Sequence, residues 1–100
     1  MTGIDQRVYK LYNLVSDITK EEMSARRQNE RKFRNWQDLT GGGRRYWLEV
    51  SGRHGWKARY IKEVDANEVT VRFHQELYDD TGTLVEIHQK YPVDLGHQKV

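Results

Sequence analysis

The stretch from Val69 to Tyr91 constrains the fold of this chain most, because its side chains alternate in character on both sides of a turn sequence. Apolar residues hold one set of positions: Val69, Val71, Phe73, Leu77, Val85, Ile87 and Tyr91. Polar residues hold the other set: Arg72, His74, Glu76, Glu86, His88 and Lys90. This alternation around Asp79-Asp80-Thr81-Gly82 predicts a β-hairpin with one buried face, in which Gly82 takes the positive φ of a type I turn plus bulge.

The same alternation predicts two further strands before this hairpin. The four expected strands cover about 44–51, 55–64, 69–78 and 83–91. Their connections are short, and short connections join antiparallel neighbours, so the strands should form a meander. In the turn over 65–68, Asn67 suits a left-handed backbone. Pro92 cannot donate to a strand ladder and should end the last strand, which leaves 93–100 as a short tail.

The N-terminal part of the chain predicts helix. Ile4, Val8, Leu11, Val15 and Ile18 form the apolar stripe of an amphipathic helix over about 4–18, which should cover the apolar face of the sheet. Residues 20–37 continue or restart the helix with few apolar positions. The glycines at 41–43 are expected to form a flexible hinge. The predicted fold is thus α+β: one or two helices packed on a four-stranded antiparallel meander.

Length and composition limit the alternatives. One hundred residues favour a single domain, with a helical half at 1–40, a hinge at 41–43, a meander at 44–92 and a tail at 93–100. The chain has no cysteine and no apolar run near the roughly 18 residues that a membrane span needs. We therefore expect a cytoplasmic protein that does not enter membranes, and no motif calls for a cofactor.

Positive charge is concentrated in the middle of the chain. Residues 26–62 hold eleven Lys and Arg against three acids, whereas residues 63–100 hold three against eight. This asymmetry indicates an acidic partner, or pairing of the two halves within the fold or a dimer. The helix over 20–37 is polar on most sides. We therefore expect Phe33 and Trp36 to pack against a partner chain, in a homodimer formed through the helical half.

Basic side chains interleaved with aromatic ones suit nucleic acid, because cations bind phosphates and rings stack on bases. The candidate nucleic-acid-binding residues are Arg26, Arg27, Arg31, Arg34, Arg45, Trp47, Lys57, Arg59 and Arg72. Those on the sheet are expected to share its outer face with Lys90. Alternatively, the same residues only keep the helix and the sheet face soluble.

A second candidate site follows from the predicted register of the hairpin. If Gly82 is the bulge residue, His74 faces His88 and Glu76 faces Glu86, so two histidines and two glutamates share one patch. Imidazole and carboxylate ligands suit zinc or manganese, which makes these four residues weak candidates for a metal site. Alternatively, neighbouring basic residues such as Lys57, Arg59 and Arg72 neutralise the glutamates on a solvated face.

Three of these residues, His74, His88 and Glu76, are with Tyr78 also candidates for general acid–base cleavage of RNA through its 2′-hydroxyl, beside neighbouring arginines. In its size, basic charge and order of helices before an antiparallel meander, the chain resembles the RelE-like ribosome-dependent RNA-cleaving toxins. Those toxins open with a strand, and no residue motif here matches theirs, so the resemblance assigns no site residue. Catalytic residues thus stay unknown, and the candidates on the His/Glu patch are His74, Glu76, Glu86 and His88.

The sequence thus predicts a small intracellular binding module that contacts nucleic acid through a basic and aromatic surface. A small nuclease or metal-dependent enzyme is one alternative, and a structural or protein-interaction dimer is another. Whether the protein is an enzyme stays open at this point.

Overall fold

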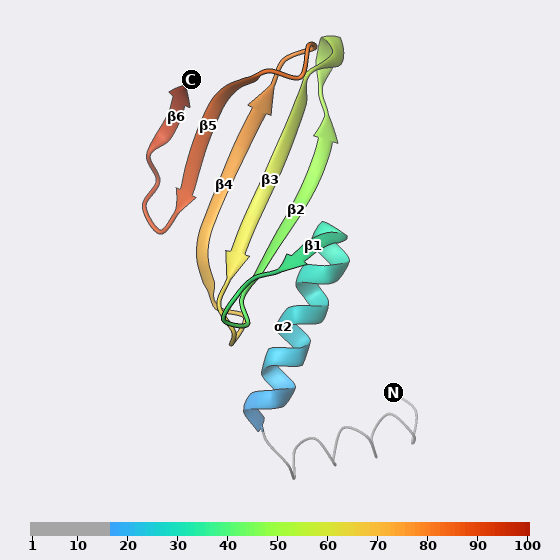
Figure 1. Ribbon diagram of the computed structural model, residues 1–100, viewed down its shortest axis with the longest axis vertical. Helices are drawn as coiled ribbons and strands as arrows, with labels where there is room; N and C mark the ends of the chain where they lie inside the picture. The colour runs from blue at the N-terminus through green and yellow to red at the C-terminus, as the bar shows by residue number, and fades with distance from the viewer. Residues whose placement is uncertain (1–16) are drawn as a thin grey trace.

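The computed structural model describes residues 17–100, which form one helix and one six-stranded antiparallel sheet (Figure 1). The elements are α2 (Asp17–Phe33), β1 (Asn35–Asp38), β2 (Arg44–Ser51), the 3₁₀ turn η1 (Arg53–Gly55), β3 (Lys57–Val64), β4 (Thr70–Tyr78), β5 (Leu84–Tyr91) and β6 (Gly96–Lys99). The strands neighbour one another in chain order, β1 to β6. The prediction of helices on a four-stranded meander is therefore wrong: the molecule is α+β, but strands predominate and two further strands extend the sheet.

The helix predicted over 20–37 ends earlier than expected. Arg34 takes a left-handed backbone conformation with φ of 71°, and its N–H still donates to the carbonyl of Glu30 at 3.0 Å. The chain then reverses, and β1 pairs antiparallel with β2, with Trp36 opposite Tyr46. The helix predicted over 4–18 lies outside the described residues except for its last two positions. Of the helices in the described part, none is long and apolar enough to span a membrane.

The glycines at 41–43 form a tight turn and not a hinge. The N–H of Leu39 donates to the carbonyl of Gly43 at 2.8 Å, and the N–H of Gly42 donates back to the carbonyl of Leu39 at 3.2 Å. Gly41 and Gly42 have φ values of 88° and 89°, which residues with a Cβ rarely adopt. The glycine run is therefore the means by which β1 turns back onto β2.

The C-terminal tail is also ordered as a strand. The Asp94 carboxylate accepts the N–H of Gly96 at 2.8 Å, and Gly96 has a φ of 69°. This turn returns the chain along β5, where His97 lies opposite His88 and Lys99 opposite Glu86. The alternation in residues 96–99 is too short to be read as a strand from sequence alone.

The β4–β5 hairpin has the predicted turn but a different register. Gly82 has a φ of 81° and its N–H donates to the carbonyl of Asp79, as expected. Tyr78 accordingly pairs with Leu84, but Leu77 then pairs with Glu86, because Val85 is an extra residue in a bulge. The register beyond it shifts by one residue, and His74 pairs with Gln89. The predicted pairs His74–His88 and Glu76–Glu86 are therefore wrong.

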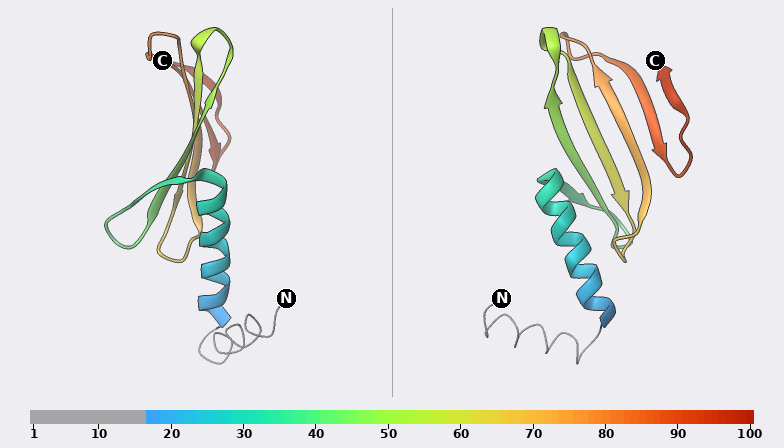
Figure 2. Two further views of the ribbon diagram at one scale, coloured as in Figure 1. Left: turned by 90° about the vertical axis from the view of Figure 1, so that its right-hand side faces the viewer. Right: turned by 180° about the vertical axis from the view of Figure 1, so that it is seen from behind.

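The register sorts the side chains of β2 to β5 onto two faces. The face on which α2 packs, called the helix-side face, carries the aligned partners Tyr46, Lys62, Phe73 and Tyr91. The opposite face, called the far face, carries the aligned partners Trp47, Ile61, His74 and Gln89. α2 lies at the end of the sheet that has the β1–β2 and β3–β4 turns (Figures 1 and 2).

The core is small and lies where α2 meets the sheet. Phe33, Tyr46 and Val64 are almost fully buried, with half-buried Leu48, Tyr60 and Phe73 around them. The rings of Phe33 and Tyr46 have centroids 5.8 Å apart. Phe33 is therefore occupied within its own chain and is not free for the dimer contact predicted for it, whereas Trp36 remains 41% exposed.

The turn assignment of the glycines predicts how alanine substitutions behave. A Cβ at Gly43 would lie 2.6 Å from the carbonyl oxygen of Val64, so Gly43→Ala should lower the free energy of unfolding by about 2–3 kcal/mol. Gly41→Ala meets no atom within 4 Å and should cost only the left-handed backbone penalty, about 1 kcal/mol. Urea unfolding measures both values. A neutral or stabilising Gly43→Ala would restore the hinge interpretation.

Candidate nucleic-acid interface

The site is organised by Glu68, which occupies a turn position that glycine holds elsewhere in the chain. In three other hairpin turns the fourth position, which has positive φ, is held by Gly42, Gly55 or Gly82. In the β3–β4 turn the corresponding residue is Glu68, with a φ of 66°. A left-handed conformation costs a residue with a Cβ about 1–2 kcal/mol. A glutamate at this position therefore points to a role for its side chain.

Local hydrogen bonds hold the backbone of Glu68 in this conformation. Oδ1 of Asp65 accepts the N–H groups of Asn67 and Val69, both at 2.9 Å. The N–H of Glu68 donates to the carbonyl of Asp65 at 3.0 Å. Asp79 makes the same pattern with Thr81 and Thr83 around Gly82. Asn67, which the sequence suggested for the left-handed position, instead lies one residue before it.

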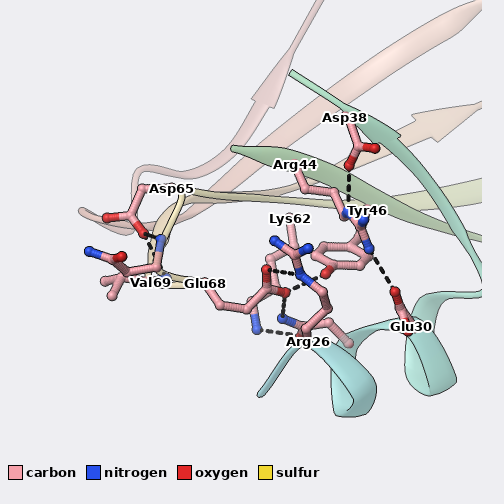
Figure 3. A network of polar contacts seen from close by, with 11 residues as sticks. Arg26, Glu30, Asp38, Arg44, Tyr46, Lys62, Asp65, Glu68 and Val69 are labelled. Carbon is pink, nitrogen blue, oxygen red and sulfur yellow. Dashed lines mark hydrogen bonds and ion pairs between the residues drawn. The ribbon is translucent and has the colours of Figure 1, made fainter. Parts of the chain in front are cut away.

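The carboxylate of Glu68 joins the helix to the sheet (Figure 3). Its side chain is 1% exposed, and it accepts hydrogen bonds from Nε of Arg26 at 3.2 Å, from Nδ2 of Asn29 at 3.0 Å and from the Tyr46 hydroxyl. Arg26 and Asn29 belong to α2, and Tyr46 belongs to β2. A buried carboxylate is stable only with such donors around it, so these contacts fix the position of α2.

Arg44 forms a second polar joint beside the first. Its guanidinium donates to Oδ1 of Asp38 and to Oε2 of Glu30, both at 2.7 Å, and it stacks 5.3 Å from the centre of the Trp36 ring. Burial opposes the charge of Arg44, but the hydrogen bonds to Asp38 and Glu30 outweigh that penalty and raise its pKa above the ordinary value. The second joint therefore ties α2, β1 and β2 together.

The two joints leave a cleft between the end of α2 and the helix-side face. Its volume is about 400 Å³. The residues that line it are Lys32, Phe33, Lys62, Val69, Thr70, Phe73 and Tyr91. Nζ of Lys90 lies 5.8 Å from the centre of the Phe73 ring, which adds a third cation at the edge. The cleft thus combines aromatic walls with positive charge.

Lys62 is held in this cleft by the network around Glu68. Its ammonium donates to Oδ1 of Asn29 at 3.0 Å, and the other end of the Asn29 amide donates to Glu68. Burial lowers the pKa of Lys62, and the positive charge of Lys32 lowers it further. Two cations that repel each other in a half-buried cleft favour an anion placed between them.

The predicted nucleic-acid-binding residues fall into two groups. On α2 and just after it, Arg27, Arg31 and Arg34 are exposed, whereas Arg26 forms an ion pair with Glu68. On the far face the cations are paired with glutamates: Arg45 and Arg72 with Glu63, and Lys57 and Arg59 with Glu49, at 3.5–3.9 Å. Trp47 lies on this face too, and Lys90 lies on the other. The far face is thus largely neutralised, while the positive charge on α2 is not.

The four predicted catalytic and metal candidates are divided between the two faces. His74 and Glu76 lie on the far face, where Nε2 of His74 is 3.1 Å from the Glu76 carboxylate. Glu86 and His88 lie on the helix-side face, because His88 pairs with Gln75. Among the described side chains of residues 24–100, no three from His, Asp and Glu are gathered as metal ligands. The bulge at Val85 therefore prevents the predicted patch from forming.

Tyr78 accompanies the two far-face candidates. Its hydroxyl donates to Oε1 of Glu76 at 2.7 Å, and burial together with this hydrogen bond raises its pKa. The guanidinium of Arg59 lies 5.6 Å from the centre of the Tyr78 ring. His74 is buried and its Nδ1 has no hydrogen-bond partner in the described part of the chain. The contacts among His74, Glu76 and Tyr78 thus form a row of side chains along β4 on the far face.

Sequence reasoning missed the residues that form the cleft. The sequence places Lys62 and Tyr91 in strands and Glu68 in a turn, but it does not show that they lie near one another. One signal was available for Glu68: the turns over 65–69 and 79–83 share an Asp at the first position, but only the second has Gly at the fourth. A comparable signal was available for Lys62: it is a lysine at a strand position whose alternation points towards the core.

Comparison with known proteins gives no relative for this chain. No protein-family model matches it, and no curated protein or solved structure does either.

Substitutions of Glu68 separate two contributions to the free energy of unfolding: the cost of its left-handed backbone and the stabilisation by its carboxylate contacts. Glu68→Gln keeps the shape but loses the charge, and should lower the free energy of unfolding by about 1–3 kcal/mol. Glu68→Gly should cost more, although it relieves the left-handed backbone, because the Tyr46 hydroxyl and the Asn29 amide lose their partner. Gly82→Glu is the matched control, since it adds the backbone cost alone. If Glu68→Gly proves as stable as the native protein, the network does not hold the helix.

The Tyr46 hydroxyl predicts a dependence on alkaline pH. Burial and the hydrogen bond to Glu68 raise the pKa of Tyr46 to about 12, from an ordinary value of 10.0. Since the pKa is raised on folding, the stabilisation is complete below pH 10 and is lost as the pH rises through 12. At pH 8 the free energy of unfolding of the native protein should exceed that of Tyr46→Phe by about 1–3 kcal/mol. This difference should shrink as the pH approaches 12. A gap that stays constant to pH 12 would contradict the assignment.

Proposed function

We propose that the protein binds single-stranded nucleic acid in the cleft between the end of α2 and strands β3 to β5. The observation that carries this proposal is the convergence of Lys32 and Lys62 on an open cleft with aromatic walls. Among the side chains that the structure describes, those of residues 24–100, neither lysine forms an ion pair with an acid. A phosphate between the two ammonium groups would relieve their repulsion and satisfy both.

The aromatic side chains support a base beside that phosphate. Tyr91 is 45% exposed at the rim of the cleft, and Phe73 is half-buried behind it. Stacking a base on an aromatic side chain contributes about 1–3 kcal/mol and requires an unstacked base. A cleft of about 400 Å³ accommodates a nucleotide, which favours a single strand over a duplex.

The exposed arginines of α2 support a path for the rest of the strand. Arg27 and Arg31 are one helical turn apart and exposed, and Arg31 precedes Lys32. The far face offers no comparable surface, because its cations are paired with Glu49 and Glu63. The proposed contact surface is therefore narrower than the sequence suggested and lies on the opposite side of the sheet from Trp47.

Salt dependence with matched lysine variants tests the proposal. A labelled single-stranded oligonucleotide of roughly 12 residues should bind with an affinity that falls steeply with salt, by fluorescence anisotropy. Lys32→Ala should weaken binding several-fold and reduce the slope of log K against log salt by about 0.7. Tyr91→Ala should cost about 1–3 kcal/mol without changing that slope.

Lys57→Ala is the control, because Lys57 is an exposed lysine on the far face, beside Glu49. It should leave the affinity unchanged. Equal losses in Lys32→Ala and Lys57→Ala would show that only overall charge matters and would remove the cleft as the site. Absence of salt-sensitive binding at low ionic strength would overturn the proposal as a whole.

A further inference from the structure

The last two strands bring two histidines into contact on the helix-side face, away from the cleft. His88 of β5 lies directly opposite His97 of β6, and their ring centroids are 4.3 Å apart at an interplanar angle of 52°. His97 belongs to the strand that sequence reasoning treated as a tail. Two neutral imidazoles in contact can share one cation between their free nitrogens.

Each ring also holds one carboxylate through one nitrogen. Nε2 of His88 is 2.7 Å from Oδ1 of Asp94, and Nδ1 of His97 is 3.1 Å from Oε2 of Glu86. A carboxylate can only accept, so in the neutral form of each ring these nitrogens carry the proton. The lone pairs then lie on the other two nitrogens, Nδ1 of His88 and Nε2 of His97.

Nδ1 of His88 is buried and has no hydrogen-bond partner among the described side chains of residues 24–100 or the described backbone. A buried nitrogen lone pair without a donor is uncommon and costs free energy. Histidines that bind metal ions have this arrangement: one nitrogen faces the ion, and the other donates to a carboxylate that orients the ring. The carboxylates of Asp94 and Glu86 occupy those orienting positions here.

We propose that His88 and His97 bind one divalent transition-metal ion of the class that prefers imidazole, such as zinc. Zn–N bonds are about 2.0–2.1 Å long, so the two ligating nitrogens should approach to roughly 3–3.5 Å, which rings in contact can reach. The side chain of His97 is 58% exposed, which leaves room for water to complete the coordination. With two protein ligands, the site is consistent with the absence of a three-residue cluster in the described chain.

The surrounding charges set limits on the affinity. Lys99 lies opposite Glu86, and Lys90 follows on β5 from His88. Asp94 and Glu86 balance these two cations, so the site is close to neutral before the ion enters. The bound ion would link β5 to β6 and stabilise the C-terminal strand. This role is independent of the cleft at Lys32 and Lys62.

Zinc titration followed by thermal unfolding and isothermal calorimetry tests this site. One zinc ion should bind per chain and raise the unfolding temperature, and chelation should reverse the rise. His97→Ala should abolish this shift. Glu86→Gln keeps both ligands but loses an orienting carboxylate, and should weaken zinc binding by about 10–100-fold.

His54→Ala is the matched control, because His54 is exposed in the β2–β3 turn. It should bind zinc as the native protein does. Equal affinity in His97→Ala and His54→Ala, or no zinc uptake by the native chain, would overturn the proposal. Oligonucleotide binding should persist in His97→Ala, so the two proposals fail independently. Circular dichroism establishes that each variant is folded.

Discussion

The buried carboxylate of Glu68 is the interaction on which the arrangement of this protein depends. Among the α2 side chains that the structure describes, residues 24–33, Phe33 is the one apolar residue that is almost fully buried. The position of the helix is therefore set by polar contacts, with Arg26, Asn29 and Tyr46 all donating to one carboxylate. Without the Glu68 carboxylate, these donors would lose their hydrogen-bond partner. The contacts therefore hold the helix in one position on the sheet. The left-handed backbone of Glu68 is the cost of placing that carboxylate.

The same network generates the cleft. Asn29 uses its amide nitrogen for Glu68 and its amide oxygen for Lys62, so the anchoring of the helix also orients the lysine. Lys32 follows on the next helical turn and meets Lys62 across the cleft. The amide of Asn29 thus connects the anchoring of the helix with the lysine of the proposed binding cleft. On the far face, by contrast, each cation has a glutamate beside it, and charge is balanced within the sheet.

The strands in the middle of the sheet follow from alternation in the sequence, and so does the β4–β5 turn with Gly82 at positive φ. The register does not follow, because the bulge at Val85 leaves the alternation almost unchanged while moving Glu86 and His88 to the other face. β1 and β6 were missed since four residues are too few to show a period. The cleft was missed because Lys62 and Tyr91 meet only through the register.

Chemical-shift mapping by NMR tests the central claim most directly, because it shows which face of the sheet a single-stranded oligonucleotide contacts. The account predicts that the largest shifts on titration fall on Lys32, Lys62 and Tyr91, with little change at Trp47 and Arg59 of the far face. Shifts centred on Trp47 and Arg59, with the cleft unchanged, would contradict it.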